Sequence, residues 1–174
     1  QQYNEYDKIA AEVIAKNSGN WYSTFTINRG SKDGILVDQN VIAGSGLVGI
    51  VTEVGAHWAT VRSIIDDSSN VSAMTVSTSA NCVVCGDLRL MDEGKLQFIH
   101  LKDDEDKIQE GEKIVTSAVS DKFLKGILIG YVSEIEEEPN NLTKTGTLTP
   151  AANLEHLKEG LVIKELKQQK EEDK

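Results

Sequence analysis

The sequence predicts a mainly β protein in which two small six-stranded β-barrels, related by internal duplication, follow a short N-terminal α-helix. The chain has 174 residues, among them 15 Val, 15 Ile and 11 Thr, and these β-branched side chains favour strands over helices. Hydrophobic residues make up 39% of the chain but aromatic residues only 5%, so the cores must be mostly aliphatic. A repeated strand pattern divides this β content into two units.

The segment 47–54 is the centre of the repeat. It returns as the segment 128–135, with Leu, Gly, Val and Glu identical at four positions and strand-forming residues at the other four. The segments 38–43 and 111–116, which precede the two copies, match as a turn followed by a short apolar strand. Because a repeated unit of this kind closes a repeated core, we expect two related barrels. Chance similarity between short Val- and Ile-rich strands is the alternative.

The segment 1–16 predicts the helix. Tyr3, Tyr6, Ala10 and Val13 follow the 3-4-3 spacing of a coiled-coil seam, and the polar segment 17–19 ends it. Two heptads are too few to hold a helix alone in water, so these side chains must pack on something. Either the helix packs on its own barrel or it is the end of a longer coiled coil. We favour the coiled coil, in which the four side chains would join two copies of the chain.

Alternating and apolar runs predict the remaining elements as strands. Residues 21–28 alternate Thr with Phe and Ile, and a glycine-containing turn follows. From residue 167 onward every residue is Lys, Gln, Glu or Asp, and we expect disorder over 167–174. Further strands are predicted at 59–65, 71–77, 81–85, 96–99, 113–116, 145–149 and 161–166.

The charge of the chain limits its partners. The formal net charge is −10, which argues against binding nucleic acid or an anionic membrane surface, because both require a cationic face. No apolar run reaches the roughly 18 residues that a membrane span needs, and no signal peptide is visible. The chain nevertheless opens on two glutamines without a Met, so we expect a piece of a longer protein.

Three motifs that often carry chemistry are better explained as structure. Cys82 and Cys85 stand in a predicted strand, where their odd spacing sends the sulfurs to opposite faces, so we expect free thiols rather than a zinc or redox site. The G-x-G-x-x-G pattern at 44–49 precedes a β-branched run and not the helix that a dinucleotide site needs. Acidic residues at 66–67 and 103–106 fit a turn and a solvated loop. No cofactor and no metal is predicted.

A double-barrel serine hydrolase is the alternative function. Two tandem barrels are also the architecture of chymotrypsin-like proteases, whose chemistry needs a serine activated by a histidine. Ser45 is the one nucleophile-like serine, and the histidines are His57, His100 and His156. Because Ser45 lacks the nucleophile-elbow pattern, no catalytic residue is assigned.

Several separated stretches resemble the bacterial rod-shape-determining protein family MreC. They occur in the order of the family and run from about residue 17 to residue 163. Leu124 departs from the family pattern, which has Pro there, and the pair Cys82 and Cys85 is not a family feature. The matching stretches are 20–27 with Gly30 and Gly34, 46–55, Gly111 with 115–117, 123–130 and 150–154.

The resemblance implies a non-enzymatic scaffold of the cell-elongation machinery that maintains rod shape. Such proteins have a short cytoplasmic start, one N-terminal membrane span, a coiled coil, and two β-barrels on the outer side of the cytoplasmic membrane. They link the cytoskeletal protein MreB and the membrane protein MreD to class B penicillin-binding proteins that build peptidoglycan. The coiled coil would make the protein a homodimer or a higher assembly.

The resemblance also implies how the chain is divided. Residues 17–70 and 148–166 would form the first barrel, and residues 71–147 would form the second barrel, inserted between them. Phe123 and Leu124 lie in a predicted loop, and we expect them to be exposed and to contact a partner protein.

Overall fold

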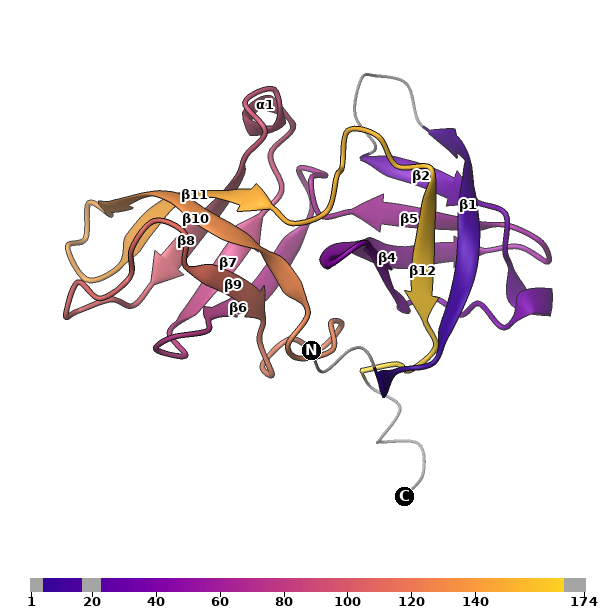
Figure 1. Ribbon diagram of the computed structural model, residues 1–174, viewed down its shortest axis with the longest axis horizontal. Coiled ribbons are helices and arrows are strands. Elements are labelled where there is room, and N and C mark those ends of the chain that lie inside the picture. The colour runs from indigo at the N-terminus through magenta and orange to yellow at the C-terminus, as the bar shows by residue number, and fades with distance from the viewer. Residues whose placement is uncertain (1–4, 17–22, 168–174) are drawn as a thin grey trace.

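The computed structural model describes residues 5–16 and 23–167, and it consists of two closed antiparallel β-barrels that lie side by side (Figure 1). Each barrel has six strands, so the predicted fold class is confirmed except for the N-terminal helix. The predicted disorder at the C-terminus falls almost entirely on residues outside those that the structure describes.

The first barrel is built from the two ends of the described chain. Its closing order is β1-β12-β3-β4-β5-β2, so the last strand completes a barrel that the first five begin. A short 3-10 helix, η2 (Ser31–Asp33), connects β2 to β3. The strands are β1 (Lys8–Lys16), β2 (Thr24–Ile27), β3 (Asn40–Ala43), β4 (Gly46–Val54), β5 (Ala59–Ser63) and β12 (Glu159–Ile163).

The second barrel is continuous in sequence, with the closing order β10-β11-β8-β7-β6-β9. Strand limits alone do not define independently folding units, so the predicted domain division of the chain stays a prediction. The elements are β6 (Asn70–Thr75), β7 (Asn81–Cys85), the single-turn helix α1 (Leu88–Met91), β8 (Leu96–Leu101), β9 (Lys113–Thr116), β10 (Leu128–Glu137) and β11 (Lys144–Pro150).

The predicted N-terminal helix is wrong for the residues that the structure describes. Residues 8–16 form β1, which pairs with β12 through Lys8–Ile163 to Glu12–Glu159 and with β2 beyond Val13. In a strand, residues an odd number apart point to opposite faces. Ala10 is therefore exposed while Val13 packs against the core, and no seam joins them. The coiled-coil interpretation fails with it over this stretch.

The turn before each copy of the repeat has the same backbone geometry. Asp38 and Gly111 both adopt positive φ, 75° and 90°, which Gly adopts freely and Asp tolerates. The backbone N–H of Asp38 donates to the carbonyl of Val51 (2.9 Å), and that of Gly111 donates to the carbonyl of Val132 (2.7 Å). Val51 and Val132 are equivalent positions of the sequence repeat. The two copies therefore share this individual hydrogen bond as well as the order of their strands.

The repeated glycine of each copy marks a close approach of two strands. A Cβ on Gly49 would lie 2.1 Å from the carbonyl oxygen of Arg62, and a Cβ on Gly130 would lie 2.2 Å from that of Thr149. No side chain fits at such distances, so both positions require glycine. The cores on either side are aliphatic, with Phe25 in the first barrel and Phe98 in the second.

Candidate partner-binding surfaces

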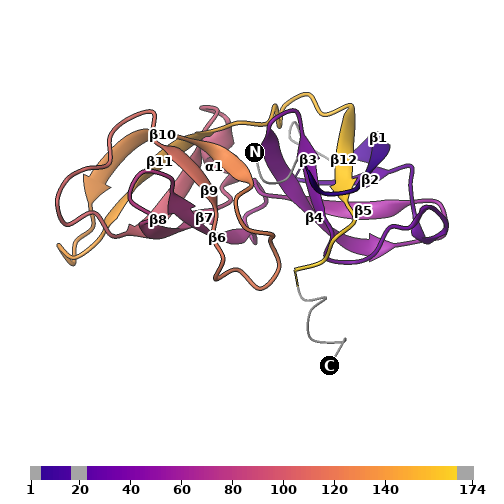
Figure 2. The same cartoon turned by 60° about the horizontal axis from the view of Figure 1, so that its bottom comes forward.

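A buried amide joins the two barrels. The side chain of Asn40, which opens β3 in the first barrel, is only 1% exposed. Its Nδ2 donates to the carbonyl of Lys122 (3.0 Å), and its Oδ1 accepts from the N–H of Leu124 (2.9 Å). Lys122 also forms an ion pair with Asp38 (2.7 Å), and the side chains of both residues are about two-fifths exposed. Asn40 therefore holds the loop between β9 and β10 against the first barrel (Figure 2).

Phe123 and Leu124 lie in this loop, as predicted, but they are buried. Their exposed fractions are 6% and 8%, because the loop packs against the first barrel. The expectation that they are exposed is wrong, and their contact with a partner protein stays a prediction that this arrangement does not favour. Sequence reasoning missed the cause, since Asn40 lies in the other half of the repeat, far earlier in the chain.

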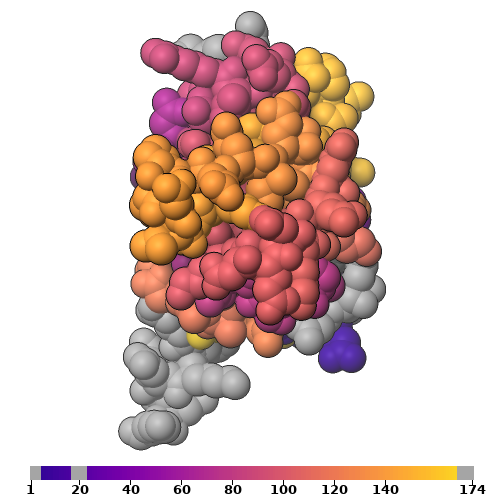
Figure 3. Space-filling model, turned by 90° about the vertical axis from the view of Figure 1, so that its left-hand side faces the viewer, coloured from indigo at the N-terminus to yellow at the C-terminus, as the bar shows by residue number. Residues whose placement is uncertain are grey.

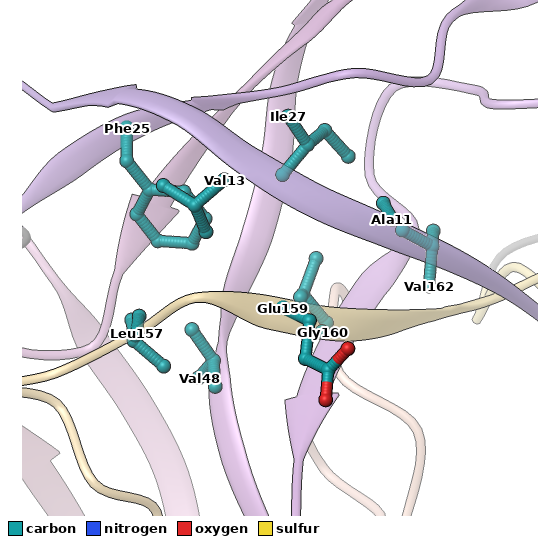
Figure 4. A pocket seen from close by; sticks show the side chains of 10 residues that line it. Ala11, Val13, Phe25, Ile27, Val48, Leu157, Glu159, Gly160 and Val162 are labelled. Carbon is teal, nitrogen blue, oxygen red and sulfur yellow. The ribbon is translucent and has the colours of Figure 1, made fainter.

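Three of the four predicted self-association residues are described by the structure, and they do not share one face. Tyr3 lies outside the described residues, Tyr6 and Val13 are half-buried against the core, and Ala10 is exposed on β1. Val13 turns inward toward Phe25 (Figure 4). A shared helical seam would need Ala10 and Val13 on one face, and the strand places them on opposite faces.

The cavity that described residues line inside the first barrel is too small for a ligand. A small apolar cavity near the β1–β12 seam is lined by Val13, Phe25 and Val48, among others (Figure 4). Its free volume is about 10 Å³, the space of a single water molecule. Small-molecule sites are far larger, so this cavity is a packing defect rather than a binding site.

The far end of the second barrel is acidic. The loop between β8 and β9 meets the β10–β11 hairpin there (Figure 3), where Lys144 forms ion pairs with Asp103 (3.0 Å) and Asp106. Burial alone would raise the pKa of Asp103, but hydrogen bonds from Lys144 and from the N–H groups of Lys107 and Ile108 outweigh it and lower the pKa. These contacts tie the loop to the hairpin, so the cluster is structural.

The cysteines and histidines that the sequence singled out lie in the barrel wall or at exposed positions. Among the described residues, no group of three or more His, Cys, Asp or Glu side chains is arranged to hold a metal. Cys82 and Cys85 are free thiols, and burial, with a smaller contribution from Cys85, raises the pKa of Cys82 to about 12. His57, His100 and His156 are all exposed.

The exposed apolar side chains are the remaining candidates for protein contacts. Most of them lie in turns, and Ile14 lies on β1 where the register with β2 shifts; Tyr131 lies within β10, and Val76 directly follows β6. Sequence reasoning missed both; the signal available was that Tyr131 replaces Ile50 in the repeat. In the described part of the chain, the large exposed apolar side chains are Ile14, Leu36, Val37, Trp58, Val76, Val119, Tyr131 and Leu142.

A family model described as the rod shape-determining protein MreC, barrel core, matches residues 13–164. The chain belongs to the MreC family. The cell shape-determining protein MreC of Listeria monocytogenes is 32% identical over 166 residues, which cover 92% of this chain and 54% of that protein. The chain thus spans about half the length of the curated relatives it matches.

Solved MreC structures share the fold. An MreC structure from Listeria monocytogenes is 34% identical, with a TM-score of 0.82 over 91% of this chain and 76% of that chain. The periplasmic domain of a cell shape-determining filament MreC gives a TM-score of 0.73 at 22% identity, over 90% of this chain and 95% of that one. MreC in a complex with the penicillin-binding protein PBP2 from Helicobacter pylori gives 0.65 at 14% identity, over 91% of this chain and 100% of that one. At these low identities the last two comparisons show the fold alone.

Proposed function

We propose that this chain is the extracytoplasmic region of a non-enzymatic scaffold of the cell-elongation machinery, which maintains rod shape by joining the cytoskeleton to peptidoglycan-synthesising penicillin-binding proteins. The observation that carries the proposal is the family match over residues 13–164, which spans both barrels. A related MreC in complex with a penicillin-binding protein supports that class of partner.

The physical character of the barrels supports a scaffold. The two cores are closed, and a buried amide and an ion pair fix one barrel against the other, so the chain offers a rigid surface of large extent. The side chains with perturbed pKa values take part in structural contacts or are buried in the barrel wall. The serine hydrolase alternative gains no support from the family match.

The remaining parts of the proposal concern the rest of the protein. An N-terminal membrane span would anchor the barrels on the outer side of the cytoplasmic membrane, and further segments would reach MreD and MreB. No helix in the described ranges is long and apolar enough to span a membrane. Self-association as a homodimer or higher assembly is retained, but without the helical seam, because residues 8–16 form a strand.

The test is a binding measurement paired with an activity probe. We expect the chain, immobilised for biolayer interferometry, to bind the extracytoplasmic region of a class B penicillin-binding protein from the same organism in a saturable manner. We also expect no covalent labelling by a serine-reactive fluorophosphonate. Absence of binding would overturn the scaffold proposal, and labelling that disappears in Ser45→Ala would favour the hydrolase.

A further inference from the structure

The duplication gives the two barrels equivalent outer faces. In the first barrel, Asn40 on β3 pairs with Ile50 on β4. In the second barrel, Lys113 on β9 pairs with Tyr131 on β10, the residue that corresponds to Ile50 in the repeat. Paired residues of neighbouring antiparallel strands lie on the same face of the sheet. The two pairs therefore occupy the same place on the outside of their barrels.

One of these faces is covered and the other is open. Asn40 and Ile50 are 1% and 4% exposed, and the β9–β10 loop is held at this place by the hydrogen bonds of Asn40. Lys113 is exposed on the second barrel, and Tyr131 is 37% exposed. The same position in the repeat is thus an internal docking site in one barrel and free surface in the other.

Loop length explains the difference. Strands β4 and β10, which are equivalent in the repeat, contact each other at the junction of the barrels. The connection between β9 and β10 spans residues 117–127 and extends over the first barrel, whereas the connection between β3 and β4 is the short turn 44–45. So short a turn cannot extend over a neighbouring barrel as the longer loop does. The second barrel is left without the segment that would cover it.

The uncovered surface is a row that runs from the residue after β6 across β9 and β10 to β11. Val76 is 53% exposed and donates its backbone N–H to the carbonyl of Lys113. On the neighbouring strands, Lys113 pairs with Tyr131, and Tyr131 pairs with Thr149. Thr149 also lines a surface hollow together with Met91 and Leu154. A rigid Tyr beside aliphatic groups and a hollow is typical of the anchoring part of a protein interface. We call the row Val76, Lys113, Tyr131 and Thr149 the open face.

We propose that the open face docks an apolar turn of the penicillin-binding protein, with a carboxylate of that turn placed against Lys113. The inference rests on the proposed function and names the surface that it uses. The covered face shows the form of the occupant, since Phe123 and Leu124 are an apolar pair in a loop. Lys113 is the residue of the second barrel that corresponds to Asn40, which binds the loop backbone in the first barrel. The open face therefore has a cation at this position, and an acidic group on the partner complements it.

The other exposed apolar side chains fit this role less well. Ile14 lies on β1 where the register with β2 shifts, and Leu36, Val37, Trp58, Val119 and Leu142 lie in loops or at a hairpin tip, where a contact surface is less rigid than on regularly paired strands. Leu142 is 75% exposed in the β10–β11 hairpin. This hairpin lies at the far end of the second barrel (Figure 3). Leu142 therefore provides a matched control for the open face.

The experiment compares three substitutions to Glu in the whole chain. Val76→Glu and Tyr131→Glu place a carboxylate on the open face, and Leu142→Glu adds the same charge elsewhere. We expect the first two to raise the Kd for the extracytoplasmic region of the class B penicillin-binding protein at least tenfold, and Leu142→Glu to change it less than twofold. Equal urea midpoints show that the variants are folded. If Tyr131→Glu does not fold, Lys113→Glu at an exposed position of the open face replaces it in the comparison.

The outcomes separate the surface from the function. Equal binding by the parent chain and all variants overturns the open face while the proposed function stands. A parent chain that does not bind overturns the proposed function itself. If Tyr131→Glu instead alters only the sedimentation of the chain alone, the face joins two copies of the chain and the proposal is wrong.

Discussion

Replacing Asn40 with Ala should loosen the junction between the barrels. The amide of Asn40 is the buried group that satisfies two backbone atoms of the β9–β10 loop, the carbonyl of Lys122 and the N–H of Leu124. Alanine at position 40 removes both of these hydrogen bonds and introduces no clash. The loop then either stays in place with unpaired polar groups or moves away and exposes Phe123 and Leu124 to water.

The structure sets the size of the effect. A buried backbone group left without a partner costs about 1–3 kcal/mol. The N–H of Leu124 lies where water does not reach, while Lys122 is half-buried and its carbonyl can take up water more easily. We therefore expect Asn40→Ala to lower the free energy of unfolding by about 2–4 kcal/mol.

Urea denaturation, followed by tryptophan fluorescence and circular dichroism, measures this loss. Asn81→Ala is the control, because Asn81 is exposed on β7, and it should change the free energy of unfolding by less than about 0.5 kcal/mol. A separate early transition in Asn40→Ala would show the barrels unfolding independently. If Asn40→Ala were as stable as Asn81→Ala, the amide would not hold the junction and the reasoning would be refuted.

Three further predictions concern the glycine of β10, the acidic loop of the second barrel and the two cysteines. Gly130→Ala should lower the free energy of unfolding by at least about 1–3 kcal/mol, because its Cβ would meet the carbonyl of Thr149; an unchanged urea midpoint would contradict this. Asp103→Asn should lower stability at pH 7, and since the folded pKa of Asp103 lies below its ordinary 3.8, the difference from the parent should hold down to about pH 4 and shrink below it; a pH-independent difference in urea titrations would count against this. Iodoacetamide should modify Cys85 before Cys82 in the folded chain, because burial raises the Cys82 pKa to about 12 while Cys85 is only half-buried; peptide mass spectrometry showing equal rates would exclude it.

The β content and the duplication could be predicted because they depend on local pattern. β-branched residues and the recurring glycines Gly49 and Gly130 are visible in short stretches of sequence. The structure places each glycine at the equivalent close approach of two strands in its own barrel. The N-terminal strand could not be recognised in this way. Ile9, Ala11 and Val13 alternate toward the core, but the same stretch also carries a helical spacing. What decides between them is β12, which lies near the other end of the described chain.

The candidate surface depended on contacts that no local pattern contains. Phe123 and Leu124 have the composition of an exposed apolar turn, but their loop packs against the other barrel, where Asn40 holds it, and this buries them. Tyr131 sits in a recognised strand, yet its exposure follows from the short turn at 44–45, which cannot cover it. Loop lengths in one copy of the repeat thus determine the free surface of the other.

Photo-crosslinking in living cells tests most directly whether the second barrel presents a docking surface to a penicillin-binding protein. p-Benzoylphenylalanine would replace Tyr131 on the open face in one strain and Leu142 at the hairpin tip in another. We expect irradiation to join the penicillin-binding protein to the chain from position 131 and not from position 142. Crosslinks from position 142 alone, or none from position 131 in cells that keep their rod shape, would contradict the claim.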